Sequence, residues 1–251
     1  MLEPVDDRAL QLTQRIEQAS LNAWPALHQV LHDGWLLRFC GGFTKRANSV
    51  SIITRGSTPL AERIDFCESL YRHQGLAPVF RLTDGCQEPG LDDLLAARGY
   101  AHIDPTDVLT ADATALAGRP LTDELGRDAW LEHYTRLSGS PAQARRLHGL
   151  LLSGIRLPCR FGVLVEAGEV VACGLAVREA DLVGLFDIVT DEAHRGHGHG
   201  ERLTAGLVAW GAQTGARITY LQVVAANAPA QRLYRRLGFT ASHRYWYRAM
   251  A

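Results

Sequence analysis

The feature that most constrains this chain is a short apolar run that leads through a glycine-rich segment into a helical pattern. The apolar run covers residues 185–190, the glycine-rich segment ends at Gly200, and the helical pattern covers residues 201–210. A junction of this kind presents backbone N–H groups without partners at the positive end of a helix dipole. The sequence therefore predicts a docking site for a phosphorylated cofactor.

The glycine spacing narrows the kind of cofactor. Arg195, Gly198 and Gly200 fit an RxxGxG pattern, and Gly196 adds a further position without a Cβ, so the backbone can approach a pyrophosphate closely. A Rossmann turn follows the first strand of its unit and has an acidic residue about 20 positions later. Here several predicted strands come before the loop, and residues 219–224 contain no Asp or Glu. The missing acidic residue disfavours a nicotinamide-dependent reductase. No Gly-Lys-Ser or Gly-Lys-Thr follows the loop, so a P-loop is excluded.

The order of predicted elements repeats along the chain. Periodicity and turn residues predict helices over residues 6–23, 60–74, 91–98, 124–137, 141–152, 201–214 and 229–237, and strands over 35–39, 48–54, 77–82, 100–109, 161–166, 170–178, 185–190, 217–224 and 239–248. The series helix, strand, helix, glycine, aromatic occurs in both halves, although such endings also recur in unrelated α/β proteins. We predict an α/β (α+β) chain of two related units, residues 1–115 and 120–251, joined by the small flexible run 111–119.

A second motif follows the glycine-rich loop further along the chain. Residues 227–239 read Asn-Ala-Pro-Ala-Gln-Arg-Leu-Tyr-Arg-Arg-Leu-Gly-Phe, which fits NxxAxxLYxxxGF. Together with the RxxGxG loop, this segment resembles the GNAT superfamily of N-acetyltransferases over residues 125–250. The resemblance implies units with a mixed, mostly antiparallel sheet flanked by helices. It also implies acetyl-CoA or another acyl-CoA as co-substrate and direct acyl transfer to a primary amine of a small molecule, peptide or protein.

The resemblance also implies roles for individual residues. Ile188 and Val189 would offer backbone groups to the pantetheine and the thioester, Asn227 would bind the pantetheine arm or fix its loop, and Tyr234 would be the general acid for the thiolate. The pyrophosphate loop would consist of Arg195, Gly196, His197, Gly198, His199 and Gly200. Two plainer interpretations stay open, namely that Tyr234 is a packed aromatic residue and that Asn227 is a helix N-cap.

The attacking amine must lose a proton, so a base is needed. Asp187 lies on the central predicted strand between Phe186 and Ile188, where partial burial would make it a better base. It could instead anchor a neighbouring loop, and Glu179 and Asp181 are weaker candidates. The alternating His194, His197 and His199 have no carboxylate or cysteine at ligand spacing, so we predict no metal site.

The first unit lacks both motifs. Residues 54–60 do not have the RxxGxG spacing, Pro59 removes an N–H donor at the helix start, and residues 89–95 have neither the Asn nor the Tyr. We predict a degenerate GNAT-like unit without an acyl-CoA site, which continues the sheet, forms one wall of the acceptor cleft, or provides a dimer surface. The polar run 45–49 could face an acidic acceptor or be a solvated hairpin end.

Composition excludes several partners. The net charge of −1 gives no general attraction for nucleic acid or an anionic membrane, and no stretch is long and apolar enough for a membrane span. Cysteines 40, 67, 86, 159 and 173 form no CxxC pair, which indicates a reducing, cytoplasmic location. A homodimer is compatible with the sequence. The alternative function is a CoA-binding regulatory or sensor module without turnover, and the acceptor is open.

Overall fold

The computed structural model describes residues 7–85 and 88–250. Its helices are α1 Asp7–Ala23, α2 Leu60–His73, α3 Leu91–Ala97, α4 Arg127–Ser138, α5 Ala142–Ser153, α6 His199–Gln213 and α7 Ala228–Arg236. Its strands are β1 His28–His32, β2 Trp35–Phe39, β3 Val50–Ile52, β4 Val79–Thr83, β5 Ala101–Asp112, β6 Asp123–Glu124, β7 Cys159–Glu166, β8 Glu169–Glu179, β9 Leu182–Thr190, β10 Ile218–Val224 and β11 Thr240–Ala249. Short 3-10 turns occur at Lys45–Ala47, Ala113–Leu116 and Glu192–His194.

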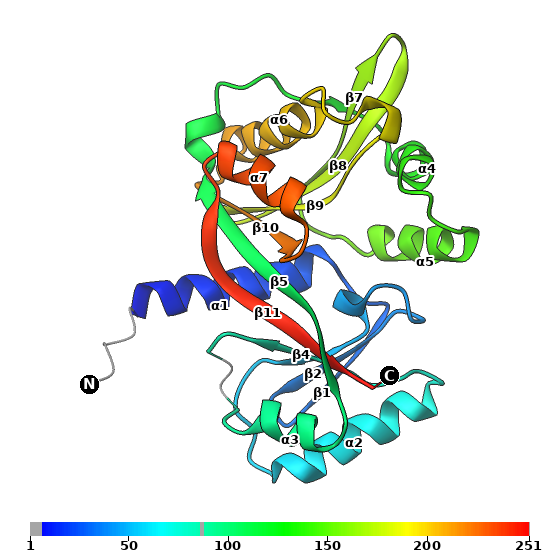
Figure 1. The fold of residues 1–251 in the computed structure, drawn as a ribbon, viewed down its shortest axis with the longest axis vertical. Coiled ribbons are helices and arrows are strands. Elements are labelled where there is room, and N and C mark those ends of the chain that lie inside the picture. The colour runs from blue at the N-terminus through cyan, green and yellow to red at the C-terminus, as the bar shows by residue number, and fades with distance from the viewer. Residues whose placement is uncertain (1–6, 86–87, 251) are drawn as a thin grey trace.

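All of these strands belong to one sheet, in the order β1-β2-β3-β4-β11-β5-β10-β9-β8-β7-β6. Within the described residues only β3 with β4 and β9 with β10 pair in parallel, so the predicted mixed, mostly antiparallel α/β architecture is confirmed. Figure 1 shows the long strands β5 and β11 running from one half of the molecule into the other. The two halves therefore have the strands β5 and β11 in common.

The two halves exchange strands across the predicted boundary. The strand β5 comes from the first part of the chain but pairs with β10, and the C-terminal strand β11 pairs with β4 from Tyr245↔Thr83 to Ala249↔Val79. The predicted boundary itself falls in an irregular segment between β5 and β6. The assignment of two separate units stays a prediction.

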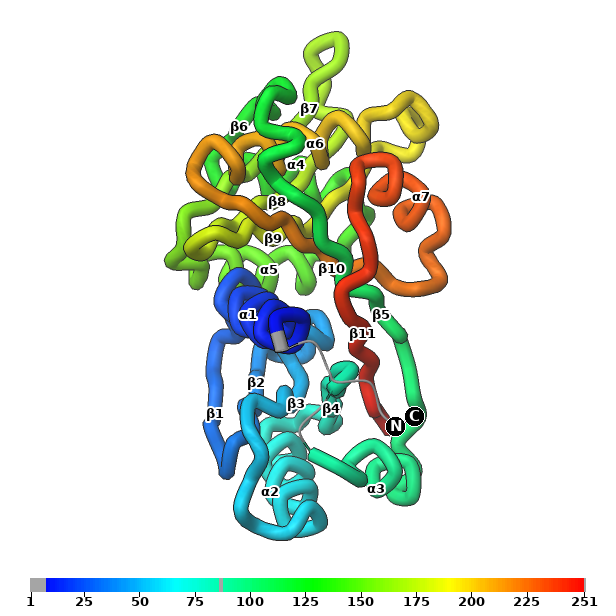
Figure 2. The backbone as a smooth tube through the Cα atoms, turned by 90° about the vertical axis from the view of Figure 1, so that its left-hand side faces the viewer, coloured from blue at the N-terminus to red at the C-terminus, as the bar shows by residue number. Residues whose placement is uncertain are grey.

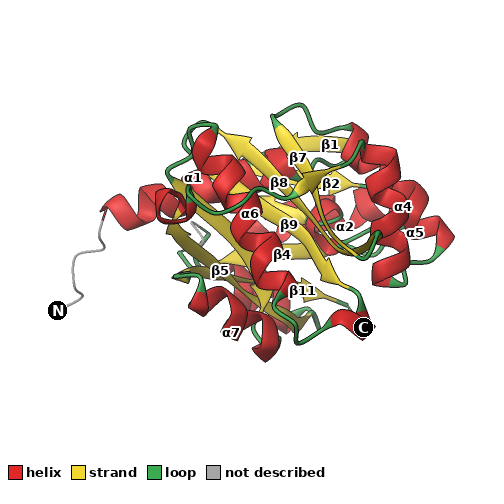
Figure 3. Ribbon diagram, turned by 90° about the horizontal axis from the view of Figure 1, so that it is seen from above, coloured by secondary structure: helices red, strands yellow, loops and turns green. Residues whose placement is uncertain are grey.

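Helix α1 lies between the two halves (Figure 2). Its Ile16 and Ala19 are buried with Trp24, which follows the helix, and the helix contacts β8, β9 and β11. Helices α4 and α5 cover one face of the second half of the sheet, and α6 and α7 cover the other (Figure 3). Because both faces are covered, eight consecutive residues of β8 are buried, and two separate apolar clusters flank this part of the sheet.

Most predicted elements are found within a few residues of their expected ends, and the expected antiparallel pairing of residues 35–39 with residues 48–54 is confirmed by the β2–β3 ladder. The strand β1 was not predicted, because its sequence, His-Gln-Val-Leu-His, lies exposed at the sheet edge without clear alternation. Cys86 lies outside the described residues. Among residues 7–85 and 88–250, no helix is long and apolar enough to cross a membrane.

Candidate active site

Strands β9 and β10 pair over only the first part of their length. Their parallel ladder runs from Leu182↔Ile218 to Leu185↔Leu221 and then stops. Beyond that point β10 stays paired with β5 on its other side, and β9 stays paired with β8. The two strands therefore separate, which leaves one edge of β9 without a ladder partner among the described strands. The predicted backbone contributors Ile188 and Val189 lie on this opened edge.

A β-bulge stands at the start of the opening. On β9, Asp187 and Ile188 together face the single residue Gly174 of β8, between the pairs Leu175↔Phe186 and Cys173↔Val189. Asp187 has a φ of 52°, a left-handed conformation that Asp tolerates better than most residues. A Cβ at Gly174 would lie 2.7 Å from a methyl group of Leu207, so glycine is required opposite the bulge.

The glycine loop supplies free backbone donors beside this opening. Gly196 and Gly198 have φ values of 81° and 80°, and a Cβ at either position would meet nothing within 4 Å. Glycine is therefore needed there for backbone conformation rather than for space. Between Gly196 and Glu201, no backbone N–H donates a hydrogen bond to another residue that the structure describes. With the N-terminus of α6 beside them, these donors fit an anion such as a pyrophosphate.

The side chains of the loop differ in what they can contribute. Arg195 is 62% exposed, and its guanidinium lies 3.7 Å from Glu192, so it is free to turn toward a bound phosphate. His197 Nδ1 lies 3.4 Å from the His194 carbonyl oxygen. His199 is buried, with Nδ1 3.7 Å from a Glu166 carboxylate oxygen. Within the described residues, no group of three His, Cys, Asp or Glu side chains is placed to hold a metal ion.

The second motif packs against the loop. A Cβ at Gly200 would lie 3.0 Å from Leu233 Cδ1, so this glycine lets α6 and α7 approach each other closely. Asn227 is the N-cap of α7, and its Oδ1 accepts a hydrogen bond of 3.2 Å from the Ala230 N–H. The capping interpretation of Asn227 thus agrees with its contacts. By ordering the start of α7, the cap also fixes the position of Tyr234, about two helix turns later.

Tyr234 lies on the α6–α7 side of the opened strand. It belongs to the same apolar cluster as Leu185 and Leu221, the last paired residues before the opening, and Ile188 packs against this cluster. Its ring centroid is 5.8 Å from that of Phe239. Burial raises the pKa of the Tyr234 hydroxyl to about 12, so the group stays protonated at neutral pH.

Asp187 lies on the opposite side, toward α4 and α5. Its Oδ2 is 2.8 Å from His148 Nε2, and both side chains are more than nine-tenths buried. Burial raises the pKa of Tyr134 on α4, and the adjacent Asp187 carboxylate raises it further. The sequence-predicted base is thus held in a polar cluster with a histidine and a tyrosine. Glu179 and Asp181 lie at the other end of the β8–β9 hairpin, where they contact Asn22 and Arg15 of α1.

An aromatic shell drawn from both halves encloses this polar cluster. Four rings lie within 6.2 Å of the His148 ring, centroid to centroid: those of Trp24, Phe43, Trp130 and Tyr134. Trp24 also stacks on Phe186 at 5.7 Å. His148 was not predicted from the sequence, because it occupies an ordinary core position on its helix, and no local pattern brings it together with Trp24 and Asp187.

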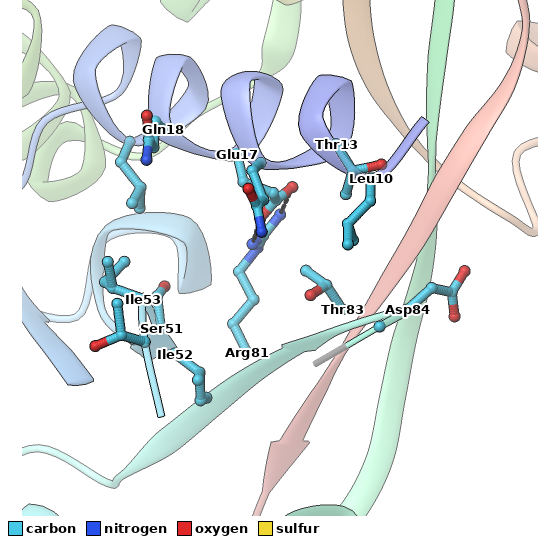
Figure 4. A pocket seen from close by; sticks show the side chains of 14 residues that line it. Leu10, Thr13, Glu17, Gln18, Ser51, Ile52, Ile53, Arg81, Thr83 and Asp84 are labelled. Carbon is cyan, nitrogen blue, oxygen red and sulfur yellow. Dashed lines mark hydrogen bonds and ion pairs between the residues drawn. The ribbon is translucent and has the colours of Figure 1, made fainter. Parts of the chain in front are cut away.

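The first half contains a comparable opening that is covered. Strands β3 and β4 pair in parallel only at Val50↔Phe80 and Ser51↔Arg81, and a cavity of about 260 Å³ follows. Figure 4 shows α1 lying over this cavity with Glu17 directed at Arg81. Burial by itself would raise the pKa of Glu17, but Arg81 and His243 outweigh it and lower the pKa to about 2. The cavity is remote from the glycine loop and belongs to the first half.

The opened parallel strand pair, the bulge and the glycine loop are the features of a GNAT-type acyltransferase. The comparisons with known proteins agree, and they define a more particular family. The family model described as "Probable histone acetyltransferase Rv0428c C-terminal" matches residues 13–248, so the chain belongs to this family of GNAT N-acetyltransferases.

Known relatives extend over nearly the whole chain. The "Uncharacterized N-acetyltransferase YobR" of Bacillus subtilis (strain 168) is 29% identical over 246 residues, which cover 94% of this chain and 97% of that protein. A GCN5-related N-acetyltransferase from Kribbella flavida has a similar structure, with a TM-score of 0.69, 17% identity and coverage of 94% and 95%. A tandem GNAT protein from the clavulanic acid biosynthesis pathway has a TM-score of 0.63 and 13% identity, with coverage of 97% and 95%.

Proposed function

We propose that this protein is an acetyl-CoA-dependent N-acetyltransferase that transfers the acetyl group directly to a primary amine of a small molecule or of a peptide or protein. The observation that carries the proposal is the opened edge of β9 next to a glycine loop with free N–H donors. The pyrophosphate would lie on the loop between Arg195 and Gly200, and the pantetheine arm would enter between β9 and β10. The N–H groups near Ile188 and Val189 would then face the thioester carbonyl.

The two faces of the opened strand support separate proton transfers. Asp187, on the α4–α5 side, would accept a proton from the attacking ammonium, which frees the nitrogen lone pair for attack on the thioester carbon. Backbone N–H groups of β9 would stabilise the oxyanion that develops. As the carbon–sulfur bond breaks, Tyr234 on the α6–α7 side would donate its proton to the departing thiolate. Its raised pKa keeps that proton available throughout the neutral range.

Two measurements test this proposal. Calorimetry of the folded protein should show binding of acetyl-CoA, and a panel of amines should release free CoA thiol. The Tyr234→Phe variant keeps the ring in its apolar cluster but removes the proton, so it should lower kcat on the order of 10²-fold while leaving acetyl-CoA affinity within a factor of about two. Equal losses of kcat and affinity would instead assign Tyr234 a packing role. Binding of acetyl-CoA without thiol release for any amine would favour the regulatory alternative.

A further inference from the structure

The first half of the chain places one positively charged side chain beside the opened strand. Arg46 lies in the short turn Lys45–Ala47, and its guanidinium carbon is 4.8 Å from the Trp24 ring centre and 5.7 Å from that of Phe186. Phe186 directly precedes Asp187 on β9. Arg46 therefore reaches the α4–α5 side of the strand, where the base of the proposed reaction is located.

Among residues 7–85 and 88–250, this guanidinium has no acidic partner. Neighbouring Lys45 is paired with Asp104 at 2.8 Å, and Arg136 is paired with Asp191. Arg46, in contrast, forms no ion pair and donates no side-chain hydrogen bond to any residue that the structure describes. The aromatic rings hold the face of the guanidinium by cation–π contact, which leaves its N–H edge free. An arginine held in this way is arranged to bind a planar oxyanion with two parallel hydrogen bonds.

The charge of Arg46 also acts on the polar cluster around the base. It lowers the pKa of Tyr134, against the larger effects of burial and Asp187, which raise it. A cation here would repel a simple amine, which arrives as an ammonium ion. An acceptor that carries both an ammonium and an anionic group avoids this repulsion, because its anionic group can neutralise Arg46 while its ammonium approaches Asp187.

We infer that the acceptor is an amine that also carries a carboxylate, as a free amino acid does, and that Arg46 binds this carboxylate. The inference rests on the proposed acetyl transfer and adds to it the class of acceptor. It also gives the first half of the chain a direct role, since Arg46 and the Trp24 ring that holds it both precede the second half. A phosphate monoester presents similar oxygen atoms, so the test separates the two sources.

The test compares matched acceptors by release of free CoA. The standard amino acids are each measured beside their amides, and phosphoethanolamine is measured beside ethanolamine. The amide of an amino acid holds its amine proton less tightly than the acid does, so intrinsic reactivity favours the amide. We expect the acids to have kcat/KM values roughly 10- to 100-fold above those of their amides, as charge-assisted hydrogen bonds of this kind provide. Preference for phosphoethanolamine over all amino acids would overturn the carboxylate assignment.

Substitutions then show whether Arg46 causes the preference. Arg46→Gln should raise KM for the acids until they resemble their amides, with kcat for the amides and affinity for acetyl-CoA unchanged, and Arg46→Lys should restore part of the preference. Lys45→Gln is the matched control, because Lys45 is directed at Asp104, and it should keep the preference intact. Equal losses for acids and amides in Arg46→Gln, or no preference in the unaltered protein, would refute the inference. Absence of acetyl-CoA binding would instead refute the proposed function.

Discussion

Replacing Gly198 by alanine tests whether the glycine loop is shaped for a pyrophosphate. Gly198 caps α6 in the left-handed region at a φ of 80°, and an added Cβ would touch nothing within 4 Å. The cost is therefore conformational, about 1–2 kcal/mol for a residue with a side chain in this region. If the loop keeps its shape, this cost lowers the free energy of unfolding. If the loop relaxes, acetyl-CoA must restore its shape, and the Kd rises by up to roughly 5- to 30-fold.

The loss of free energy of unfolding and the loss of acetyl-CoA binding free energy should together equal the conformational cost. Urea unfolding measures the first loss, and calorimetry with acetyl-CoA measures the second. Gly75→Ala is the matched control, because Gly75 also has a positive φ, 67°, and open space around its Cβ position, but it lies in the first half of the chain. It should lose similar stability without any change in acetyl-CoA affinity. The reasoning fails if Gly198→Ala changes neither quantity, or if Gly75→Ala weakens binding as much.

The buried charges give the remaining predictions for single residues. Asp187→Asn keeps a residue that tolerates the left-handed conformation but removes the base, so kcat should fall by roughly 10²- to 10⁴-fold with acetyl-CoA affinity unchanged. His148→Gln should lower kcat by a smaller factor, since His148 acts through its contact with Asp187. If the loss of activity is fully explained by a loss of folded protein in an unfolding assay, this positioning role is contradicted. Because its pKa is lowered from 4.5 to about 2, Glu17 should contribute about 3 kcal/mol to the free energy of unfolding at pH values above 4.5. This contribution is lost as the pH falls toward about 2. In Glu17→Gln, the free energy of unfolding should therefore depend less on pH over that range.

The His148 and Glu17 variants each have a matched control in the chain. His133→Gln, on the neighbouring helix α4, should leave kcat unchanged, because within the described part of the chain the ion pair of Asp187 is with His148 and not with His133. Glu62→Gln replaces an exposed carboxylate on α2 and should keep the acid dependence of the unaltered protein. An acid dependence of Glu17→Gln equal to that of the unaltered chain would show that the Glu17–Arg81 pair does not govern stability at low pH.

The sequence predicted those parts of the site that depend on neighbouring residues in the chain. Glycine spacing located the loop, and the Asn227-to-Phe239 pattern located the helix that carries Tyr234, because caps, turns and helix periodicity are local signals. The left-handed bulge at Asp187 was not predicted, since Asp is also common in ordinary strand ends and loops. The contact of Asp187 with His148, 39 residues earlier, depends on how α5 packs on the sheet, and no periodicity reports such packing.

The boundary between residues 115 and 120 illustrates the same limit, and it leads to a last prediction. A fragment of residues 120–251 would contain both motifs but would lose β5, which pairs with β10 and β11, and β4, which pairs with the end of β11. It would also lose Trp24, which packs on His148 and Phe186. Unpaired strand edges and uncovered aromatic rings favour aggregation over folding. We therefore expect this fragment to be insoluble alone and to bind acetyl-CoA only when produced together with residues 1–119. A folded fragment that binds acetyl-CoA by itself would show that the second half is an independent domain despite the shared strands.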